Sequence, residues 1–194
     1  RRETGLALEI IPPEEGARLA VISCAPLVSP RTEQLLVVDI GGGSTELVWI
    51  DLSGVEPDER PKSIMRLHTG FHSQGEKSAR VVDWISVPLG VATLKDQFGD
   101  VEDDAARFAL MSWFFEEQLA NFSPYNAQHP RDGFQIVGTS GTVTTVAASF
   151  LGLRRYDRTK VDGLLMTSDQ IDTVIRDYLS LGPEGRRTDP RIGR

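Results

Sequence analysis

The feature that most constrains this chain is a run of three glycines between two strand-like segments. Residues 35–40 (LLVVDI) are apolar except for one carboxylate, which is typical of a strand buried on both faces. Residues 44–51 (STELVWID) have the β-branched and aromatic content of a second strand. Because Gly41, Gly42 and Gly43 separate the two segments, the pattern predicts a β-hairpin with a glycine-rich turn.

This turn has the composition of a phosphate-binding loop. Glycines reach positive φ values and leave backbone N–H groups open to an oxyanion, and Ser44 and Thr45 add hydroxyl donors. Asp39 precedes the turn and Glu46 shares a strand face with Ser44. Acids at these places can hold a divalent cation or orient a water. A turn without function is the alternative, but it does not need three consecutive glycines, which are entropically unfavourable.

A second loop of this kind lies between a predicted strand at residues 134–137 and a predicted helix at residues 144–151. A helix N-terminus presents free N–H groups to an anion, although Ser and Thr also cap helices that bind nothing. Two such loops in one chain favour a shared site for a polyanion or nucleotide. The second loop consists of Gly138, Thr139, Ser140, Gly141 and Thr142.

The rest of the chain alternates strand-like and helix-like segments, which predicts an α/β fold with a mixed sheet. Strands are expected at residues 6–11, 63–68 and 81–87. Helices are expected at residues 13–25 and 90–98, after an Asp103–Asp104 cap, and from residue 168. The polar residues 182–193 are expected to form a loose tail.

Charge and composition exclude several functions. The chain has 28 acidic and 21 basic residues and a net charge of -7, so it lacks the basic surface needed to wrap duplex nucleic acid. A phosphate site in such a chain must act by local geometry. No apolar run approaches the roughly 20 residues that span a bilayer. The single cysteine, Cys24, predicts a small core residue, no internal disulfide, and a reducing, cytoplasmic location.

Two further groups of polar residues are weaker candidates. His68 and His72 have a spacing seen in metal sites but no evident third ligand, so a packing or surface role is expected. A basic run predicts a solvated face, with contact to a long phosphate chain as the alternative. This run consists of Arg154, Arg155, Arg158 and Lys160.

Several of these segments together resemble the exopolyphosphatase/guanosine pentaphosphate phosphohydrolase (Ppx/GppA) family. The most specific is residues 37–48 (VVDIGGGSTELV). The others are residues 8–11 (LEII), 17–19 (ARL), 86–90 (SVPLG), 137–142 (VGTSGT), 156–157 (YD) and 160–163 (KVDG). The resemblance implies a fold of two ribonuclease-H-like lobes around a cleft, as in the actin, sugar-kinase and Hsp70 superfamily.

The resemblance also implies which part of that fold the chain forms. The first phosphate loop of the family, an Asp-x-Gly-Ser-Asn segment in the N-terminal lobe, is not found in this sequence. We therefore expect residues 1–194 to form one lobe, the second, truncated at both ends. Residues 1–30 are a candidate inter-lobe segment, and the missing N-terminal lobe is an expected partner.

By resemblance, the activity is hydrolytic release of terminal phosphate from polyphosphate or guanosine pentaphosphate with Mg²⁺, in bacteria. Asp39 and Glu46 match the acids that bind the cation or act on the water. The turn at residues 41–44 matches a phosphate loop, and residues 138–142 match the loop facing the nucleotide or the distal phosphates. Members of the family often pair as homodimers.

One departure from the family concerns the proposed catalytic base, a Glu immediately before the Ala of an Ala-Arg-Leu segment. Here that position is Gly16, and Glu15 is one residue earlier, about 100° round a helix. Either Glu15 serves as the base, or the base is absent and the chain is a regulatory module that binds polyphosphate or a guanosine polyphosphate without turnover. A third alternative is a relative of the sugar and acetate kinases.

Overall fold

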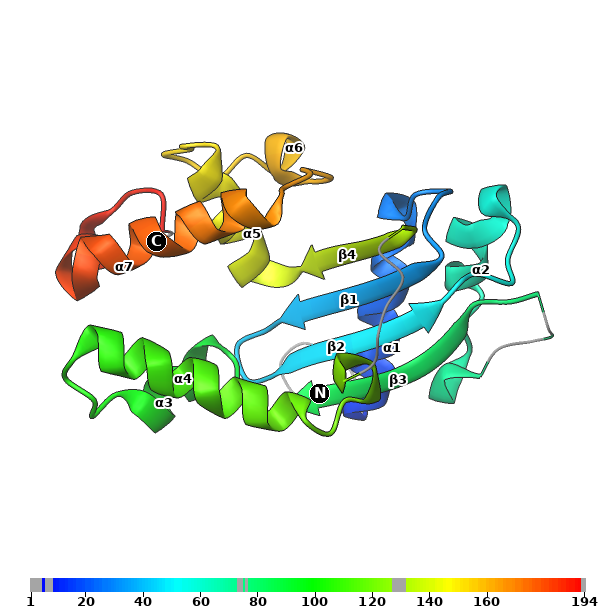
Figure 1. Cartoon of the computed structure of the whole chain (residues 1–194), viewed down its shortest axis with the longest axis horizontal. Helices are drawn as coiled ribbons and strands as arrows, with labels where there is room; N and C mark the ends of the chain where they lie inside the picture. Colours follow the sequence, from blue (N-terminus) through cyan, green and yellow to red (C-terminus); the bar gives the residue numbers. More distant parts are fainter. Residues whose placement is uncertain (1–4, 6–8, 73–74, 76, 127–131, 193–194) are drawn as a thin grey trace.

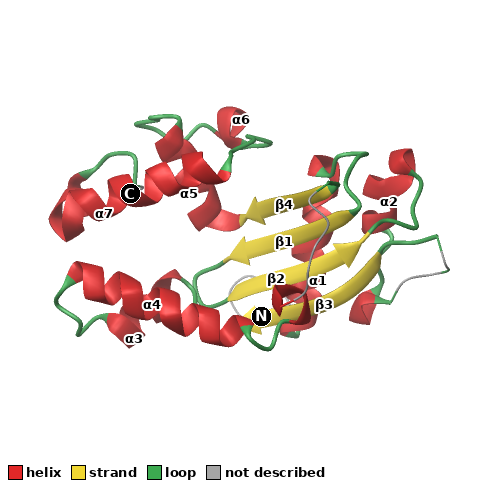
Figure 2. Cartoon of the chain, in the orientation of Figure 1, coloured by secondary structure: helices red, strands yellow, loops and turns green. Residues whose placement is uncertain are grey.

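The chain folds around a four-stranded mixed sheet with the strand order β3-β2-β1-β4 (Figures 1 and 2). The computed structural model describes residues 5, 9–72, 75, 77–126 and 132–192. Strands β1 (Gln34–Ile40), β2 (Thr45–Asp51) and β3 (Arg80–Val87) are antiparallel neighbours, and β4 (Phe134–Thr139) runs parallel to β1. The predicted α/β class and the predicted hairpin are both confirmed.

Seven α-helices are found in the described part of the chain. They are α1 (Pro13–Cys24), α2 (Arg60–Met65), α3 (Val91–Phe98), α4 (Asp104–Leu119), α5 (Ser140–Phe150), α6 (Arg158–Val161) and α7 (Ser168–Thr188). The 3₁₀ turns are η1 (Ala25–Leu27), η2 (Pro57–Glu59), η3 (Thr69–Phe71) and η4 (Ser123–Asn126).

Helices cover both faces of the sheet, as alternating strand side chains require. On one face, Val37 and Val48 pack with Val21 of α1 in the larger buried cluster. On the other face, Leu47 and Trp49 of β2 pack against apolar side chains of α3 and α4. Both faces of the central strands are therefore apolar, which explains their near-continuous hydrophobic sequences.

Local sequence signals set the ends of the helices that flank the site. Helix α1 begins with Pro13, whose missing N–H is not needed in a first turn. Helix α4 begins after Asp103, whose carboxylate accepts a hydrogen bond from the Ala106 N–H at 2.7 Å. Helix α7 begins after Thr167, which forms a capping box with Gln170.

Beyond the N-terminal segment, three predictions of secondary structure are wrong in part. Residues 60–65 form helix α2 where a strand at 63–68 was predicted. Ile64 is buried and Met65 is exposed, and a segment this short fits the hydrophobic periodicity of a strand as well as that of a helix. Helix α5 begins at Ser140 rather than at residue 144. The tail expected to be loose from residue 182 bends at Gly182 (φ 63°) and continues as helix to Thr188.

Two further expectations concern the N-terminal strand and a membrane-spanning helix. Of the predicted strand at 6–11, residues 6–8 lie outside the described residues and residues 9–11 form no strand. No helix among the described residues combines the length and the apolar character needed to cross a bilayer.

Candidate functional site

The glycine turn joins β1 to β2 and exposes its tip. Gly42 and Gly43 are exposed, and the Gly41 N–H closes the turn on the Ser44 carbonyl at 2.9 Å. The prediction that these glycines take positive φ values is wrong, because none of Gly41, Gly42 and Gly43 does so. The carbonyls of Gly41 and Gly42 accept hydrogen bonds from the Val91 and Ala92 N–H groups of α3, at 3.1 and 2.8 Å. Within the described residues, the N–H groups of Gly42, Gly43 and Ser44 have no acceptor, so these amides are free to bind an anion.

Gly90 fixes the position of this turn, a role that was not predicted from the sequence. A Cβ atom at Gly90 would lie 2.4 Å from the Gly42 carbonyl carbon and 2.6 Å from the Gly41 carbonyl oxygen. Buried Thr45 donates its hydroxyl to the Leu89 carbonyl at 2.7 Å. The turn therefore rests directly on the segment after β3. The sequence signal that could have indicated this role is that Gly90 belongs to residues 86–90, one of the segments that resemble the Ppx/GppA family.

The second loop joins β4 to α5 through a left-handed residue. Ser140 has a φ of 74°, which is uncommon for a residue with a side chain. Its hydroxyl donates a hydrogen bond to the carboxylate of Asp39. A Cβ atom at Gly138 would lie 2.7 Å from Val143 Cγ1, so this glycine allows α5 to pack closely on β4. The first turn of α5 thereby faces the end of β1.

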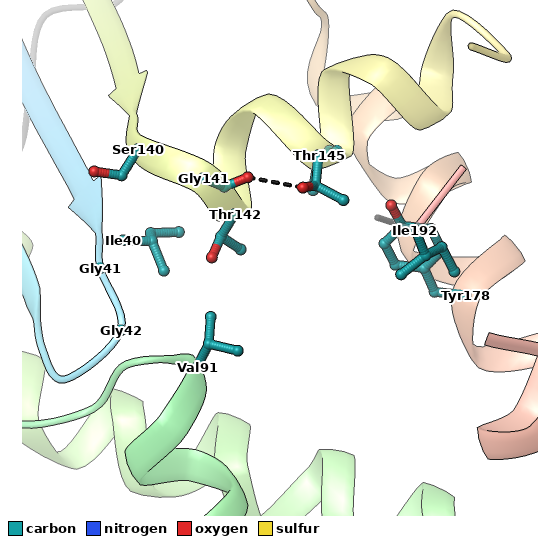
Figure 3. Close-up of a pocket in the computed structure, with 11 residues that line it drawn as sticks. Ile40, Gly41, Gly42, Val91, Ser140, Gly141, Thr142, Thr145, Tyr178 and Ile192 are labelled. Carbon is teal, nitrogen blue, oxygen red and sulfur yellow. Dashed lines mark hydrogen bonds between the residues drawn. The ribbon is translucent and has the colours of Figure 1, made fainter. Parts of the chain in front are cut away.

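The two loops line one pocket of about 630 Å³ (Figure 3). Gly41 and Gly42 lie on one side, and Ser140, Gly141 and Thr142 at the N-terminus of α5 lie on another. The remaining lining is mostly apolar and comes from β1, α3, α5 and the C-terminal segment: Ile40, Val91, Thr145, Val146, Tyr178 and Ile192. The sheet thus brings together two loops that are about a hundred residues apart in the sequence.

The two candidate acids lie side by side at the end of the sheet. Asp39 and Glu46 are directly paired in the β1–β2 register, so their side chains leave the same face. Neither acid lines the 630 Å³ pocket, because Ile40, the neighbour of Asp39, projects to that side. Asp39 reaches the pocket through its hydrogen bond with Ser140, which is one of the lining residues.

The donor set of this pair fits Mg²⁺. Glu46 Oε1 accepts hydrogen bonds from the hydroxyls of Ser44 at 2.6 Å and Ser86 at 2.8 Å. Within the described chain, Glu46 Oε2 and Asp39 Oδ2 have no donor, which leaves one carboxylate oxygen of each acid free. The described residues contain no cluster of three or more His, Cys, Asp or Glu. Two carboxylates suffice for Mg²⁺, which commonly completes its coordination with phosphates and waters.

Glu15 is engaged elsewhere. Both oxygens of its carboxylate accept hydrogen bonds from Arg18, at 2.5 and 2.8 Å, and Arg18 also donates to the Leu67 carbonyl at 2.8 Å. The hydrogen bond from Arg18 lowers the pKa of Glu15, which makes this carboxylate a weaker base. A Cβ atom at Gly16 would meet nothing within 4 Å, so this position has room for a side chain.

The other candidates have structural or surface settings. Cys24 is buried, as predicted, and this burial raises the pKa of its thiol. The His72 ring lies over Gly70, 3.1 Å from where a Cβ atom would be. In the basic run, which is exposed, Arg158 pairs with Asp162 and Lys160 pairs with Asp157.

Comparison with known proteins identifies a family and several solved structures that are similar to the chain. The Ppx/GppA phosphatase family matches residues 1–159. The crystal structure of the Aquifex aeolicus member of that family shares 28% sequence identity with the chain at a TM-score of 0.65, over 100% of the chain and 52% of that protein. An exopolyphosphatase-like protein shares 25% identity at a TM-score of 0.66, over 98% of the chain and 55% of that protein.

A more distant structure supports the fold alone. An exopolyphosphatase from Cytophaga hutchinsonii shares 18% identity at a TM-score of 0.61, over 98% of the chain and 56% of that protein. The chain spans about half the length of each of these structures.

Proposed function

The chain belongs to the Ppx/GppA phosphatase family, and from this membership we propose that it forms the second lobe of a hydrolase that releases terminal phosphate from inorganic polyphosphate or guanosine pentaphosphate. The chain spans about half the length of its solved relatives, which supports a partner lobe on the other side of the cleft. In this proposal the isolated chain is nearly inactive, because half of the cleft belongs to that lobe.

The observation that carries the proposal is the convergence of two anion-binding loops on one pocket. The free amide of Gly42 and the N-terminus of α5 at Gly141 line this pocket and offer N–H groups to phosphate oxygens, and the free amide of Gly43 follows Gly42 in the turn. The net charge of -7 gives no general attraction for a polyanion, so binding depends on these local donors. Donors fixed by the fold stabilise the charge that develops in phosphoryl transfer.

The paired acids supply the second element of the proposed chemistry. Asp39 and Glu46 would hold Mg²⁺ with their free carboxylate oxygens. When bound, this ion neutralises phosphate charge and lowers the pKa of a coordinated water. Ser140 fixes Asp39 and links it to the pocket, so that the acids and the phosphate loops act on the same group.

The residues at the expected position of the catalytic base favour a second candidate function. Glu15 is paired with Arg18 and Gly16 has no side chain, so neither is suited to remove a proton from water. A chain that keeps the phosphate loops and lacks the base would bind polyphosphate or a guanosine polyphosphate without turnover. This regulatory module is the alternative to the hydrolase.

The discriminating experiment measures phosphate release and binding in the same intact protein. We expect release of orthophosphate from polyphosphate or guanosine pentaphosphate in the presence of Mg²⁺, and a loss of at least 100-fold in kcat for Glu46→Gln. Binding without release by the wild type would overturn the hydrolase proposal and support the regulatory module. Transfer of phosphate to or from ATP would instead support a kinase-like relative.

A further inference from the structure

Ser86 is placed beside a candidate acid although it belongs to neither phosphate loop. It lies next to the last residue of β3, where it is directly paired with Glu46 of β2. Glu46 is in turn paired with Asp39, and Asp39 with Thr139 of β4. These four residues form one row across the end of the sheet, and directly paired residues project from the same face.

The Ser86 hydroxyl holds one oxygen of Glu46. Ser86 Oγ donates to Glu46 Oε1 at 2.8 Å, and Ser44 Oγ donates to the same oxygen at 2.6 Å. Within the described residues Glu46 Oε2 accepts no hydrogen bond. Two donors on a single oxygen restrict rotation of the carboxylate and aim the other oxygen away from the protein donors.

The position of Ser86 is itself rigidly determined. The next residue, Val87, is fully buried and pairs with buried Thr45. Leu89 is buried as well and its carbonyl accepts the Thr45 hydroxyl at 2.7 Å. The end of β3 therefore cannot shift without moving the glycine turn. The Ser86 hydroxyl is held in place next to the Glu46 carboxylate as a result.

From these contacts we propose that Ser86 is a positioning residue that orients Glu46 for cation binding at the end of the sheet. The proposal rests on the proposed function, because it takes Glu46 as a ligand of the divalent cation. Ser86 acts through Glu46 and does not itself contact the phosphate chain. Supporting donors of this kind typically change metal affinity or activity by 10- to 100-fold when they are removed.

The test compares Ser86→Ala with a chemically matched control in the turn that follows β2. Ser53 Oγ donates to Asp51 Oδ1 at 2.6 Å near the other end of β2, so Ser53→Ala removes a serine-to-carboxylate hydrogen bond away from the site. Ser86→Thr keeps the hydroxyl and suits a β-strand. All three variants are made in the intact protein.

Two readouts separate positioning from a structural role. We expect Ser86→Ala to weaken Mn²⁺ binding, followed by electron paramagnetic resonance, by about 10-fold, and to lower kcat more than it raises KM. Ser86→Thr should recover most of both losses, and Ser53→Ala should match the wild type. Equal Mn²⁺ affinity in Ser86→Ala and the wild type would overturn the proposal, as would a wild type that binds no Mn²⁺.

A failure of the Ser86 proposal can be distinguished from a failure of the proposed hydrolase function. A wild-type protein that binds Mn²⁺ but releases no phosphate contradicts the hydrolase and leaves the Mn²⁺ titration of Ser86→Ala to decide the positioning role. A Ser86→Ala protein with lower melting temperature but unchanged Mn²⁺ affinity shows a structural role and overturns the positioning role.

Discussion

Replacing Gly90 with alanine should displace the glycine turn. The added methyl carbon would lie 2.4 Å from the Gly42 carbonyl carbon, where ordinary contact begins at 3.4 Å, so the turn must move by about 1 Å. The hydrogen bonds from Val91 and Ala92 to the turn, now 3.1 and 2.8 Å, would lengthen to about 4 Å and be lost. The backbone angles of Gly90, φ -131° and ψ -177°, suit alanine, so the methyl contact is the main perturbation.

The size of the effect follows from these two bonds. Two neutral hydrogen bonds contribute about 2 kcal/mol to the free energy of unfolding. The lower entropy of the unfolded alanine variant offsets up to about 1 kcal/mol of that loss. We therefore expect Gly90→Ala to be destabilised by about 1 to 2 kcal/mol, which is a fall of about 2 to 8 °C in melting temperature. A 1 Å misplacement of the turn should reduce kcat/KM for phosphate release by about 100-fold.

Thermal unfolding and phosphate-release kinetics of the intact protein measure both effects. Gly43→Ala is the stability control, because a Cβ atom at Gly43 meets nothing within 4 Å, and its melting temperature should equal or slightly exceed that of the wild type. A Gly90→Ala protein with unchanged melting temperature and unchanged kinetics would refute the reasoning that the turn rests on Gly90.

Two further predictions concern helices α1 and α7. Gly16→Glu, at a position with open space, should stabilise α1 by about 0.5–1 kcal/mol and raise kcat at least 100-fold if a base was missing; an unchanged kcat would show that position 16 takes no part. Arg186 of α7 forms a bidentate pair with Asp104 of α4, and we expect Arg186→Met to lower the free energy of unfolding by at most about 1 kcal/mol. Arg187 pairs with Glu184 on the exposed surface, so Arg187→Met should leave the free energy of unfolding almost unchanged. The hydrogen bond from Arg186 lowers the pKa of Asp104 from its ordinary value of 3.8. The contribution of this pair to the free energy of unfolding is therefore complete above about pH 4 and should vanish as the pH falls through the lowered pKa. Equal losses of stability for the two variants, measured by urea unfolding at pH 7, would contradict a link between α4 and α7.

The hairpin and its two acids could be predicted from the sequence because their signals are local. The apolar run around Asp39 predicts a buried strand, and the glycines after it predict the hairpin. The register that places Glu46 opposite Asp39 was not predicted, because it depends on how many residues the turn takes up. The presence of two such loops favoured a shared site, and the parallel pairing of β4 with β1, which brings the loops to one pocket, is seen only in the structure.

Other features depend on contacts between distant segments and could not be predicted in this way. The contact of Gly90 with the turn joins residues almost 50 positions apart, and nothing local distinguishes this glycine from a simple helix cap. Helix α2 is short, and buried Arg60 is held there by the carbonyls of Val55 and Pro30. The hydrogen bonds between Arg18 and Glu15 join residues three positions apart on one helix. The hydrogen bond from Arg18 to the Leu67 carbonyl joins distant segments, so it could not be predicted from that spacing.

The most direct test of the account is a titration of the intact protein, labelled with ¹⁵N-glycine, with tripolyphosphate. The amide resonances of Gly42 and Gly141, which line the pocket from the two loops, should shift together, since both loops contact the same bound anion. Those of Gly133 and Gly152, which lie outside the pocket lining, should stay in place. Saturable binding that leaves the loop glycines unshifted, or that shifts one loop without the other, would contradict the shared phosphate site.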